Sequence, residues 1–242
     1  MMKSAKSSHA AIIRNLVASV QRLSFAPPVS HVYNPLEYAR EAYDAYLARY
    51  GSGKKEILLL GMNPGPWGMT QTGIPFGEVN AVKNWLKINR GVHPPHDMHP
   101  ERPVTGFNCP RSEVSGRRLW EWAQKRYRTP KAFFSRFFVA NYCPLVFMEA
   151  GGKNRTPDAL PAAEKKPLLA ACDRALQETV ALLQPSFVIG VGNFAAKQAQ
   201  RALAGSGIAL GSITHPSPAN PRANKGWEAF IEKELEDLGI RI

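Results

Sequence analysis

The sequence predicts an α/β protein with three layers, in which a central four-stranded parallel sheet lies between two layers of helices. Four short runs are almost continuously apolar, at residues 56–62, 137–147, 186–192 and 208–214. Strands without apolar–polar alternation are typical of a parallel sheet that is buried on both faces. Segments with helical periodicity separate these runs, as right-handed crossovers between parallel strands require.

The first 30 residues predict a helical extension of the domain. Apolar side chains share one helical face at Ile13, Leu16, Val17, Val20 and Leu23. Arg14 interrupts what would be the apolar stretch of a signal peptide, and no small-residue cleavage site follows. A transit peptide is the alternative interpretation, because the segment is basic and contains several serines.

The other predicted helices alternate with the strands. Their ranges are 36–50, 79–89, 112–127, 167–184, 193–204 and 225–238. Residues 91–116 are rich in proline and predict an ordered loop, and residues 157–166 predict a linker. We expect one domain over residues 1–242, because a chain of this length with 44% hydrophobic residues can form a single core.

The charge of the chain favours a polyanionic partner. There are 31 lysines and arginines against 19 acidic residues, which leaves a net charge of +12. A surface that neutralises phosphates gains free energy from counterion release, whereas generic solubility is the alternative use of such a charge. The three cysteines form no C-x-x-C pair, which favours a reducing compartment over a disulfide framework. No apolar run has the length of a membrane span, so we expect no membrane partner.

Polar side chains follow three of the predicted strands. The first strand runs into "GMNPGP", the second into "NYCPL" and the fourth into "HPSPANPRANKGW". In an open α/β sheet, ligands bind outside the carboxyl ends of the strands. We therefore expect Asn63, Asn141 and His215 to face one shared crevice, where together they indicate a site.

Two other motifs could indicate a cofactor or metal site. "GVGNFA" at 190–195 matches a dinucleotide-binding fingerprint, but the following strand ends in Thr214-His215 without the acidic residue that would hold the ribose. A tight strand-to-helix turn is the favoured role of its glycines. His93, His96 and His99 recur at every third residue, but a loop does not fix metal ligands, so exposed or phosphate-facing histidines are favoured over a metal site.

Carboxylates are absent from the three motifs at the strand ends, which argues against ordinary glycoside hydrolysis by paired acids. An amide such as Asn63 cannot titrate and can only orient a water or hold a substrate. Loss of a nucleobase from deoxyribose fits such a site. The base leaves as an anion with charge on O2, a histidine donor stabilises that oxygen, and a positioned water traps the sugar.

The long motifs "GMNPGPWGMTQTGIPFGEV", "NYCPL" and "HPSPANPRANKGW", with "SEVSG" and "GVG", resemble those of the single-strand-selective monofunctional uracil-DNA glycosylases, a branch of the uracil-DNA glycosylase superfamily. The resemblance covers roughly residues 50–240. It implies the superfamily fold, with DNA crossing the strand ends. It also implies hydrolysis of the N-glycosidic bond of uracil to leave an abasic site, without lyase activity, metal or cofactor.

The resemblance implies a role for several residues of these motifs. Asn63 is implied to position the attacking water, and His215 to stabilise the uracil anion at O2. Asn141 is implied to read the base edge, since its amide can accept from N3–H and donate to O4, whereas cytosine presents the reverse pattern. Phe76 matches the aromatic on which the flipped base stacks, with core packing as the alternative role.

Met62 and Gly65 match positions near C5 of the base. Uracil-specific relatives place a bulky tyrosine there, so the space left by glycine implies acceptance of 5-hydroxymethyluracil. The segment after the fourth strand is implied to enter DNA or contact phosphates. Its DNA-binding residues are Ser217, Pro218, Ala219, Asn220, Arg222 and Lys225. Small Ala219 stands where animal members carry a basic residue, so efficient flipping from duplex DNA is not expected. For Lys225, a Schiff-base nucleophile is the less favoured alternative.

We therefore expect a monomeric DNA repair enzyme that acts on uracil and related pyrimidines in single- or double-stranded DNA. Two alternatives remain: a superfamily member that acts on xanthine or hypoxanthine, and a damaged-DNA-binding protein without turnover. We expect the protein to lie with the genome, in a bacterial cytoplasm or nucleoid, or in a eukaryotic nucleus.

Overall fold

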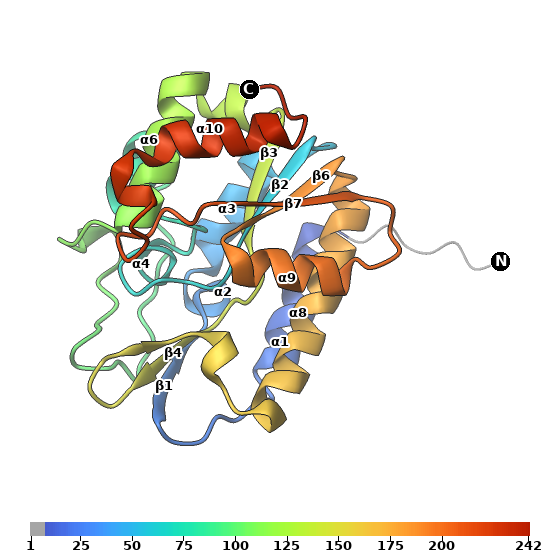
Figure 1. Ribbon diagram of the computed structural model, residues 1–242. Helices are drawn as coiled ribbons and strands as arrows, with labels where there is room; N and C mark the ends of the chain where they lie inside the picture. Colours follow the sequence, from blue (N-terminus) through green and yellow to red (C-terminus); the bar gives the residue numbers. More distant parts are fainter. Residues whose placement is uncertain (1–7) are drawn as a thin grey trace.

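A computed structural model describes residues 8–242 and contains the predicted parallel sheet (Figure 1). Its four strands are β2 (Ile57–Gly61), β3 (Phe137–Asn141), β6 (Phe187–Val191) and β7 (Ala209–Ile213). They pair in parallel in the order β3-β2-β6-β7. Residues 57–60 of β2 are at most 1% exposed, as the continuous apolar run predicts. The three-layer α/β fold class is therefore confirmed.

Two glycines show that helices cover both faces of the sheet. A Cβ on Gly190 of β6 would collide with Ala196 of α9 (Asn193–Ala202), so this face of β6 meets α9 directly. A Cβ on Gly211 of β7 would lie 2.6 Å from Leu238, which follows α10 (Trp227–Asp237). Gly190 pairs with Ser212, the neighbour of Gly211, so the two glycines face opposite sides. The first "GVG" glycine thus permits close packing of a strand and a helix.

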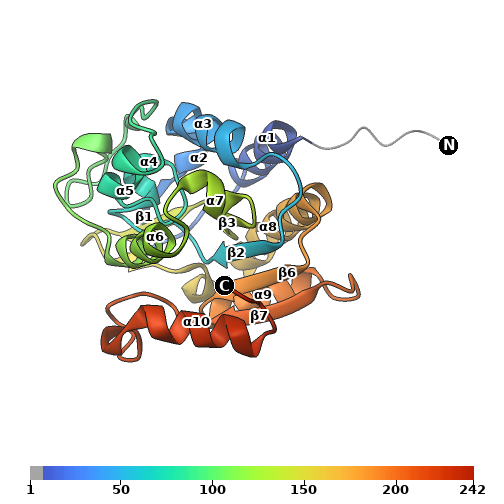
Figure 2. The ribbon, with the colours of Figure 1, turned by 90° about the horizontal axis from the view of Figure 1, so that it is seen from above.

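The remaining large helices complete the two layers. Helices α1 (His9–Val20) and α8 (Ala162–Leu183) lie side by side on the α9 face (Figure 2). Helices α6 (Val114–Tyr127) and α7 (Pro130–Phe134) lie with α10 on the other face, where Trp122 of α6 packs edge-on against Phe137. Helix α3 (Arg40–Tyr50) packs against β3, and the hydroxyl of Tyr46 donates to the carbonyl of Val139.

The amphipathic N-terminal helix is confirmed as α1. Its buried side chains are Ile12, Ile13, Leu16 and Val20, while Leu23 lies beyond its end. Ser8 caps the helix, because its Oγ accepts from the backbone N–H of Ala11. The predicted extension also includes residues 1–7, which lie outside the described part of the chain.

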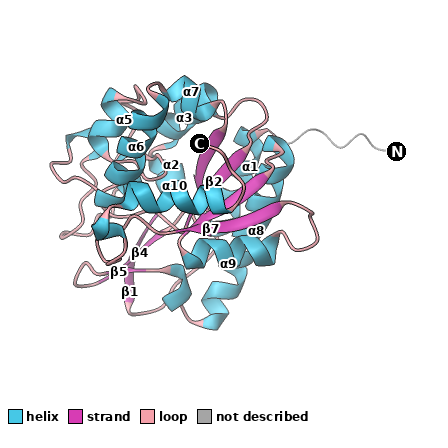
Figure 3. Ribbon diagram, turned by 45° about the horizontal axis from the view of Figure 1, so that its top comes forward, coloured by secondary structure: helices cyan, strands magenta, loops and turns pink. Residues whose placement is uncertain are grey.

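A second, antiparallel sheet was not predicted (Figure 3). It contains β1 (Val29–Tyr33), β4 (Val146–Glu149) and β5 (Asn154–Arg155), in the order β1-β4-β5. The apolar run at 137–147 is thus divided between two sheets, since "YCPL" breaks the pairing after β3. The strands are short and pair over long sequence distances, which local patterns do not reveal.

Three predicted helices have different bounds. The helix at 36–50 is two helices, α2 (Pro35–Tyr38) and α3, with fully buried Ala39 between them. The helix at 79–89 is α5 (Val79–Asn84), which ends before Lys87 adopts a positive φ of 57°. Helix α8 begins at Ala162, within the predicted linker, and includes Pro167. A proline this close to the helix start removes only one hydrogen bond.

Several short helices complete the chain, and most of them were not predicted. These are α4 (Met69–Thr72), which precedes α5, and the 3₁₀ turns η1 (Gly106–Asn108), η2 (Pro157–Ala159) and η3 (Ala223–Lys225). Within residues 8–242, no helix is both long and apolar enough to cross a membrane.

Candidate active site

A pocket of about 220 Å³ lies at the carboxyl ends of β2, β3 and β7. Its walls contain all three side chains that the strand ends predicted. The residues that line it are Met62, Asn63, Pro64, Gly65, Met69, Phe76, Glu113, Ser115, Asn141, Asn154, Thr156, His215 and Ser217. The sheet topology thus brings together segments that are up to about 150 residues apart in the chain.

The amide of Asn63 is held by the loop that follows β3. Its Nδ2 donates to the backbone carbonyl of Leu145 at 3.0 Å and lies 3.5 Å from the carbonyl of Pro64. With the amino group engaged there, Oδ1 remains as the acceptor of the side chain. Oδ1 can therefore accept a hydrogen bond from a water molecule in the pocket, although the amide cannot take up the proton of that water.

His215 is a neutral hydrogen-bond donor. The backbone N–H of Ser217 donates to its Nδ1 at 3.1 Å, so the ring proton is on Nε2. Burial lowers the pKa of His215 to about 4, because desolvation disfavours the imidazolium. Gly192, with a φ of 88°, lies against the ring, and a Cβ there would be 3.1 Å from the Cβ of His215. The second "GVG" glycine therefore makes room for this histidine.

Phe76 lines the pocket with an unusual backbone. Its φ is 54°, a conformation that costs a residue other than glycine about 1–3 kcal/mol. Its carbonyl accepts hydrogen bonds from Nε1 of Trp120 at 2.8 Å and from the backbone N–H of Glu78 at 2.7 Å. A Cβ on Gly116 would collide with the same carbonyl, so the glycine of "SEVSG" permits this approach. The surroundings thus fix the ring as a wall of the pocket.

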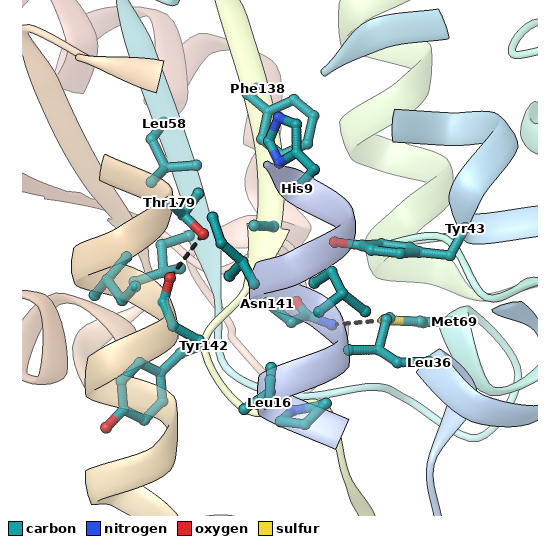
Figure 4. Close-up of a pocket in the computed structure, with 17 residues that line it drawn as sticks. His9, Leu16, Leu36, Tyr43, Leu58, Met69, Phe138, Asn141, Tyr142 and Thr179 are labelled. Atoms are coloured by element: carbon teal, nitrogen blue, oxygen red, sulfur yellow. Dashed lines mark hydrogen bonds between the residues drawn. The ribbon is translucent and has the colours of Figure 1, made fainter. Parts of the chain in front are cut away.

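Asn141 lines two cavities, of which Figure 4 shows the apolar one beside α1. Its Nδ2 donates to Sδ of Met69 at 3.3 Å, and its Oδ1 lies over Gly61, where a Cβ would collide with it. On one side Asn141 faces the pocket at the strand ends. On the other it borders an apolar cavity of about 40 Å³ under α1, lined by residues that include His9, Leu16 and Phe138. Helix α1 and Asn141 therefore line the same cavity.

Backbone pairing beyond the strand ends fixes β2 and β3 relative to each other. Tyr142 donates to the carbonyl of Gly61 at 2.9 Å, and Cys143 donates to the carbonyl of Met62 at 2.8 Å. Met62 and Asn141 therefore keep a constant separation. Beside them Gly65 leaves open space, since the nearest atom to a Cβ there is Cγ of Glu113 at 4.0 Å.

The structure adds a carboxylate to the site. Glu113 lines the pocket, although the motifs at the strand ends contain no acid. Burial raises the pKa of its carboxyl group, while its oxygens accept from the backbone N–H groups of Ser115 and Gly116. Glu113 is therefore the N-terminal cap of α6. The predicted helix at 112–127 included Glu113 in its first turn, where an acid is favoured by the helix dipole and does not by itself indicate a pocket.

Five further pocket residues were not predicted. Pro64 and Met69 follow β2, Ser115 lies in "SEVSG", Asn154 lies in β5, and Thr156 comes directly after β5. The Oδ1 atom of Asn154 is buried and has no hydrogen-bond partner within residues 8–242. The sequence contained no indication of Asn154 and Thr156, because strand β5, which contains Asn154 and precedes Thr156, was not predicted.

The predicted DNA-binding residues after β7 lie in one loop. Ser217 reaches the pocket, and its Oγ accepts from the backbone N–H of Ala219, which is exposed with Pro218 at the tip. Asn220 donates to the carbonyl of His215 at 3.2 Å. The loop is therefore tied to the catalytic candidate and presents small side chains outward.

The two basic residues of this loop differ. Arg222 pairs with Glu234 at 3.3 Å and lies 4.9 Å from the centroid of the Phe230 ring. Lys225 is exposed, and within residues 8–242 it forms no salt bridge. Lys225 is also not among the residues that line the pocket.

The histidine repeat is not a metal site. His99 is fully buried, and its Nε2 lies 3.1 Å from the carbonyl oxygens of Glu149 and Ala150. The prediction of exposed or phosphate-facing histidines is therefore wrong for His99, whose role is to anchor a loop. His93 and His96 are exposed. Among residues 8–242, no three His, Cys, Asp or Glu residues are placed to hold a metal ion together.

Comparison with known proteins identifies the family. The profile of the "Uracil DNA glycosylase superfamily" matches residues 48–239. The chain belongs to this superfamily. It is 48% identical over 227 residues to the "Single-strand selective monofunctional uracil-DNA glycosylase" of Rattus norvegicus, covering 93% of this chain and 82% of the relative. The Bos taurus protein named "Single-strand selective monofunctional uracil DNA glycosylase" is 47% identical over 91% of this chain and 82% of its own length.

A solved structure supports the superfamily fold. The crystal structure of wild-type SMUG2 from Pedobacter heparinus superposes with a TM-score of 0.67, covering 94% of this chain and 97% of that protein. The two sequences are 19% identical, so this similarity concerns the fold alone. The predicted resemblance and the fold of this superfamily member are confirmed.

Proposed function

We propose that this superfamily member is a monofunctional uracil-DNA glycosylase that extrudes uracil from DNA and hydrolyses its N-glycosidic bond. The product is an abasic site, the starting point of base excision repair. One observation carries the proposal: the neutral donor His215, the acceptor Asn63 and the amide of Asn141 line one pocket at the sheet edge. The two relatives above bear names that describe the same activity.

His215 stabilises the leaving base in this mechanism. As the bond between the sugar and N1 breaks, negative charge develops on O2 of uracil. The N–H of Nε2 can donate to this oxygen because Nδ1 is engaged by Ser217. A fixed donor directed at a developing charge lowers the barrier, since no reorganisation is needed when the charge forms.

Asn63 positions the nucleophile. The sugar becomes positively charged as the base departs, so a water molecule can attack it without a strong base. The hydrogen bond from Nδ2 to Leu145 orients the amide, and Oδ1 can then accept from the attacking water. Asn141 reads N3–H and O4 of the base, and Phe76 supplies the stacking wall.

The shape of the pocket supports a broader range of bases. The open space beside Gly65 accommodates a substituent on C5, so 5-hydroxymethyluracil is a second substrate. Pro218 and Ala219 form a small tip that fills the space of an extruded base poorly. We infer that single-stranded DNA is processed more readily than duplex DNA.

We also propose that the protein acts as a monomer, because one sheet brings together Asn63, Asn141 and His215 at its strand ends. We place the protein with the genome, because its substrate is DNA. Lys225 serves a phosphate contact in this proposal, since it does not line the pocket where a Schiff base would form.

A labelled oligonucleotide with one uracil tests the activity. The protein is incubated with the single strand, and one half of the product is treated with alkali. Breakage only after alkali supports the proposal, whereas breakage without alkali identifies a lyase. Binding without breakage identifies a damaged-DNA-binding protein, and parallel substrates with xanthine or hypoxanthine identify a changed base preference.

A further inference from the structure

Two arginines share one aromatic ring beside the pocket. The Cζ atom of Arg111 lies 4.4 Å from the ring centroid of Trp67, and that of Arg102 lies 5.4 Å from it. We call Trp67, Arg102 and Arg111 the Trp67 cluster. Trp67 stands in the chain between Gly65 and Met69, which both line the pocket. The cluster therefore adjoins the site on the side of the loop after β2.

One buried amide joins the two loops that carry the cluster. Gln71 is fully buried, and its Nε2 donates to the carbonyls of Pro66 and Pro103, both at 3.0 Å. Its Oε1 accepts from the backbone N–H groups of Thr105 at 2.9 Å and Gly106 at 3.2 Å. All the hydrogen-bonding groups of this side chain thus hold the proline-rich loop against the loop that contains Trp67.

Tyr33 and His99 fix the same loop just before Arg102. The hydroxyl of Tyr33 accepts from the backbone N–H of His99 at 2.6 Å and donates to the carbonyl of Arg102 at 3.0 Å. The buried imidazole of His99 in turn lies against the carbonyls of Glu149 and Ala150. The backbone at Arg102 is therefore set before any ligand binds, which reduces the entropy lost on binding.

The charges of the cluster lack acidic partners. Within residues 8–242, neither Arg102 nor Arg111 forms a salt bridge with a carboxylate, whereas Arg222 pairs with Glu234. Two guanidinium groups on one ring repel each other unless an anion lies near them. Nη1 of Arg102 donates to the carbonyl of Glu101 at 2.8 Å. Stacking on an aromatic face leaves the other N–H groups at the edge of a guanidinium available to phosphate oxygens.

We propose that the Trp67 cluster binds backbone phosphates of the DNA strand next to the extruded nucleotide. This inference rests on the proposed function, because it assigns the cluster to the strand that enters the same pocket. Arg102 and Arg111 supply the charge, and Trp67 holds both guanidinium groups in place. The cluster thereby adds a second phosphate-binding surface to the loop after β7.

The test compares the double variant Arg102→Gln/Arg111→Gln with Arg14→Gln, which removes a charge from the exposed side of α1. Steady-state kinetics on a single-stranded oligonucleotide with one uracil are measured between about 50 and 200 mM salt, on variants whose thermal unfolding matches the wild type. We expect the double variant to raise KM roughly tenfold at the lowest salt and to leave kcat within about twofold. The slope of log(kcat/KM) against log[salt] should become shallower by about 1.4. This is about 0.7 for each of the phosphates that the variant no longer neutralises.

Variants of Trp67 test whether DNA binding needs the aromatic ring as well as the two charges. Trp67→Ala should raise KM as the double variant does, and Trp67→Phe should restore it, because phenylalanine retains an aromatic face for the guanidinium groups. An unchanged KM and salt slope in the double variant would overturn the inference. If the wild type does not release uracil, the proposed function fails. Fluorescence anisotropy with the same oligonucleotide then tests the cluster independently, and equal affinities of the double variant and Arg14→Gln overturn it.

Discussion

The backbone N–H of Ser217 donates to Nδ1 of His215 at 3.1 Å, and this contact fixes both the tautomer and the charge of the imidazole. A nitrogen that accepts a hydrogen bond cannot carry the proton, so the proton is on Nε2. Protonation of Nδ1 would break the contact, and burial already lowers the pKa of His215 to about 4. The candidate catalytic group is thus a neutral donor at physiological pH.

The depressed pKa of His215 predicts a loss of stability in acid. Its folded pKa of about 4 lies below the ordinary value of 6.5, so the unfolded chain binds more protons between these values. The free energy of unfolding should therefore decrease as the pH falls from 6.5 toward 4, by up to about 1.4 kcal/mol per pH unit. Urea unfolding should show that the free energy of unfolding decreases more between pH 7 and pH 5 for the wild type than for His215→Gln. Equal losses would contradict this role of the imidazole.

Removing either polar group at the reacting bond should slow the chemistry and spare binding. We expect Asn63→Ala and His215→Ala each to lower the single-turnover rate on uracil-containing DNA by at least roughly a hundredfold. His215→Ala removes the donor to the charge that develops on O2, and Asn63→Ala removes the acceptor that positions the attacking water. Asn15→Ala, on the exposed side of α1, is the control. Anisotropy should give an unchanged affinity for the DNA, and a loss of affinity in proportion to the rate would refute these roles.

The parts of the site that follow parallel strands were predictable from the sequence. Asn63, Asn141 and His215 each lie at the end of a predicted strand or within a few residues of it, and topology alone directs such positions to one edge. The expected burial on both faces is wrong for β7, because it is an edge strand in which only Ile213 is buried. The resemblance added Phe76, which no strand pattern identifies. Its position depends on a positive φ and on hydrogen bonds from Trp120 and Glu78.

The remaining parts depend on contacts that local patterns do not contain. Asn154 reaches the pocket through the pairing of β4 with β5, and β5 has only two residues. His99 is an anchor because backbone carbonyls surround it, although its spacing from His93 and His96 favoured exposure. Glu113 lay within the predicted helix at 112–127, and only its packing near Gly65 and Gly68 reveals its place in the pocket.

Two glycines in one segment should respond differently to the same substitution. A Cβ on Gly65 would meet only Cγ of Glu113 at 4.0 Å, so Gly65→Ala should fold normally and narrow the space beside C5 of the base. We expect kcat/KM of this variant to fall about tenfold more for 5-hydroxymethyluracil than for uracil, because one added methyl group in a pocket commonly changes discrimination by this amount.

Gly61→Ala is the contrasting variant. Its Cβ would collide with Oδ1 of Asn141 and lie 2.7 Å from Cε2 of Phe76, so both walls of the pocket must move. Activity on the two bases should fall together, with a loss of stability of about 1–3 kcal/mol from overpacking. Equal effects of Gly65→Ala on both bases would remove Gly65 from substrate selection.

The contact between Asn141 and Met69 predicts an effect on activity toward uracil. Nδ2 of Asn141 donates to Sδ of Met69 at 3.3 Å, and leucine retains the volume of methionine without the acceptor. The free energy of unfolding of Met69→Leu should therefore lie within about 1.5 kcal/mol of the wild-type value, while its kcat/KM on uracil should be a few-fold lower. The comparison uses urea unfolding and steady-state kinetics. Unchanged kinetics would show that the thioether does not orient the amide.

Helix α1 should stabilise the fold through the apolar side chains that it places over the sheet (Figure 4). Ile12 is 1% exposed and lines the cavity that also borders Leu58, Phe138 and Asn141. Ile12→Ala enlarges this cavity and should lower the free energy of unfolding by about 2–5 kcal/mol, while Asn15→Ala on the exposed side should change it by less than about 0.5 kcal/mol. At a temperature where both variants are folded, kcat for Ile12→Ala should decrease if α1 also positions Asn141. If Ile12→Ala lowers the free energy of unfolding as expected but leaves kcat unchanged, α1 has a structural role only.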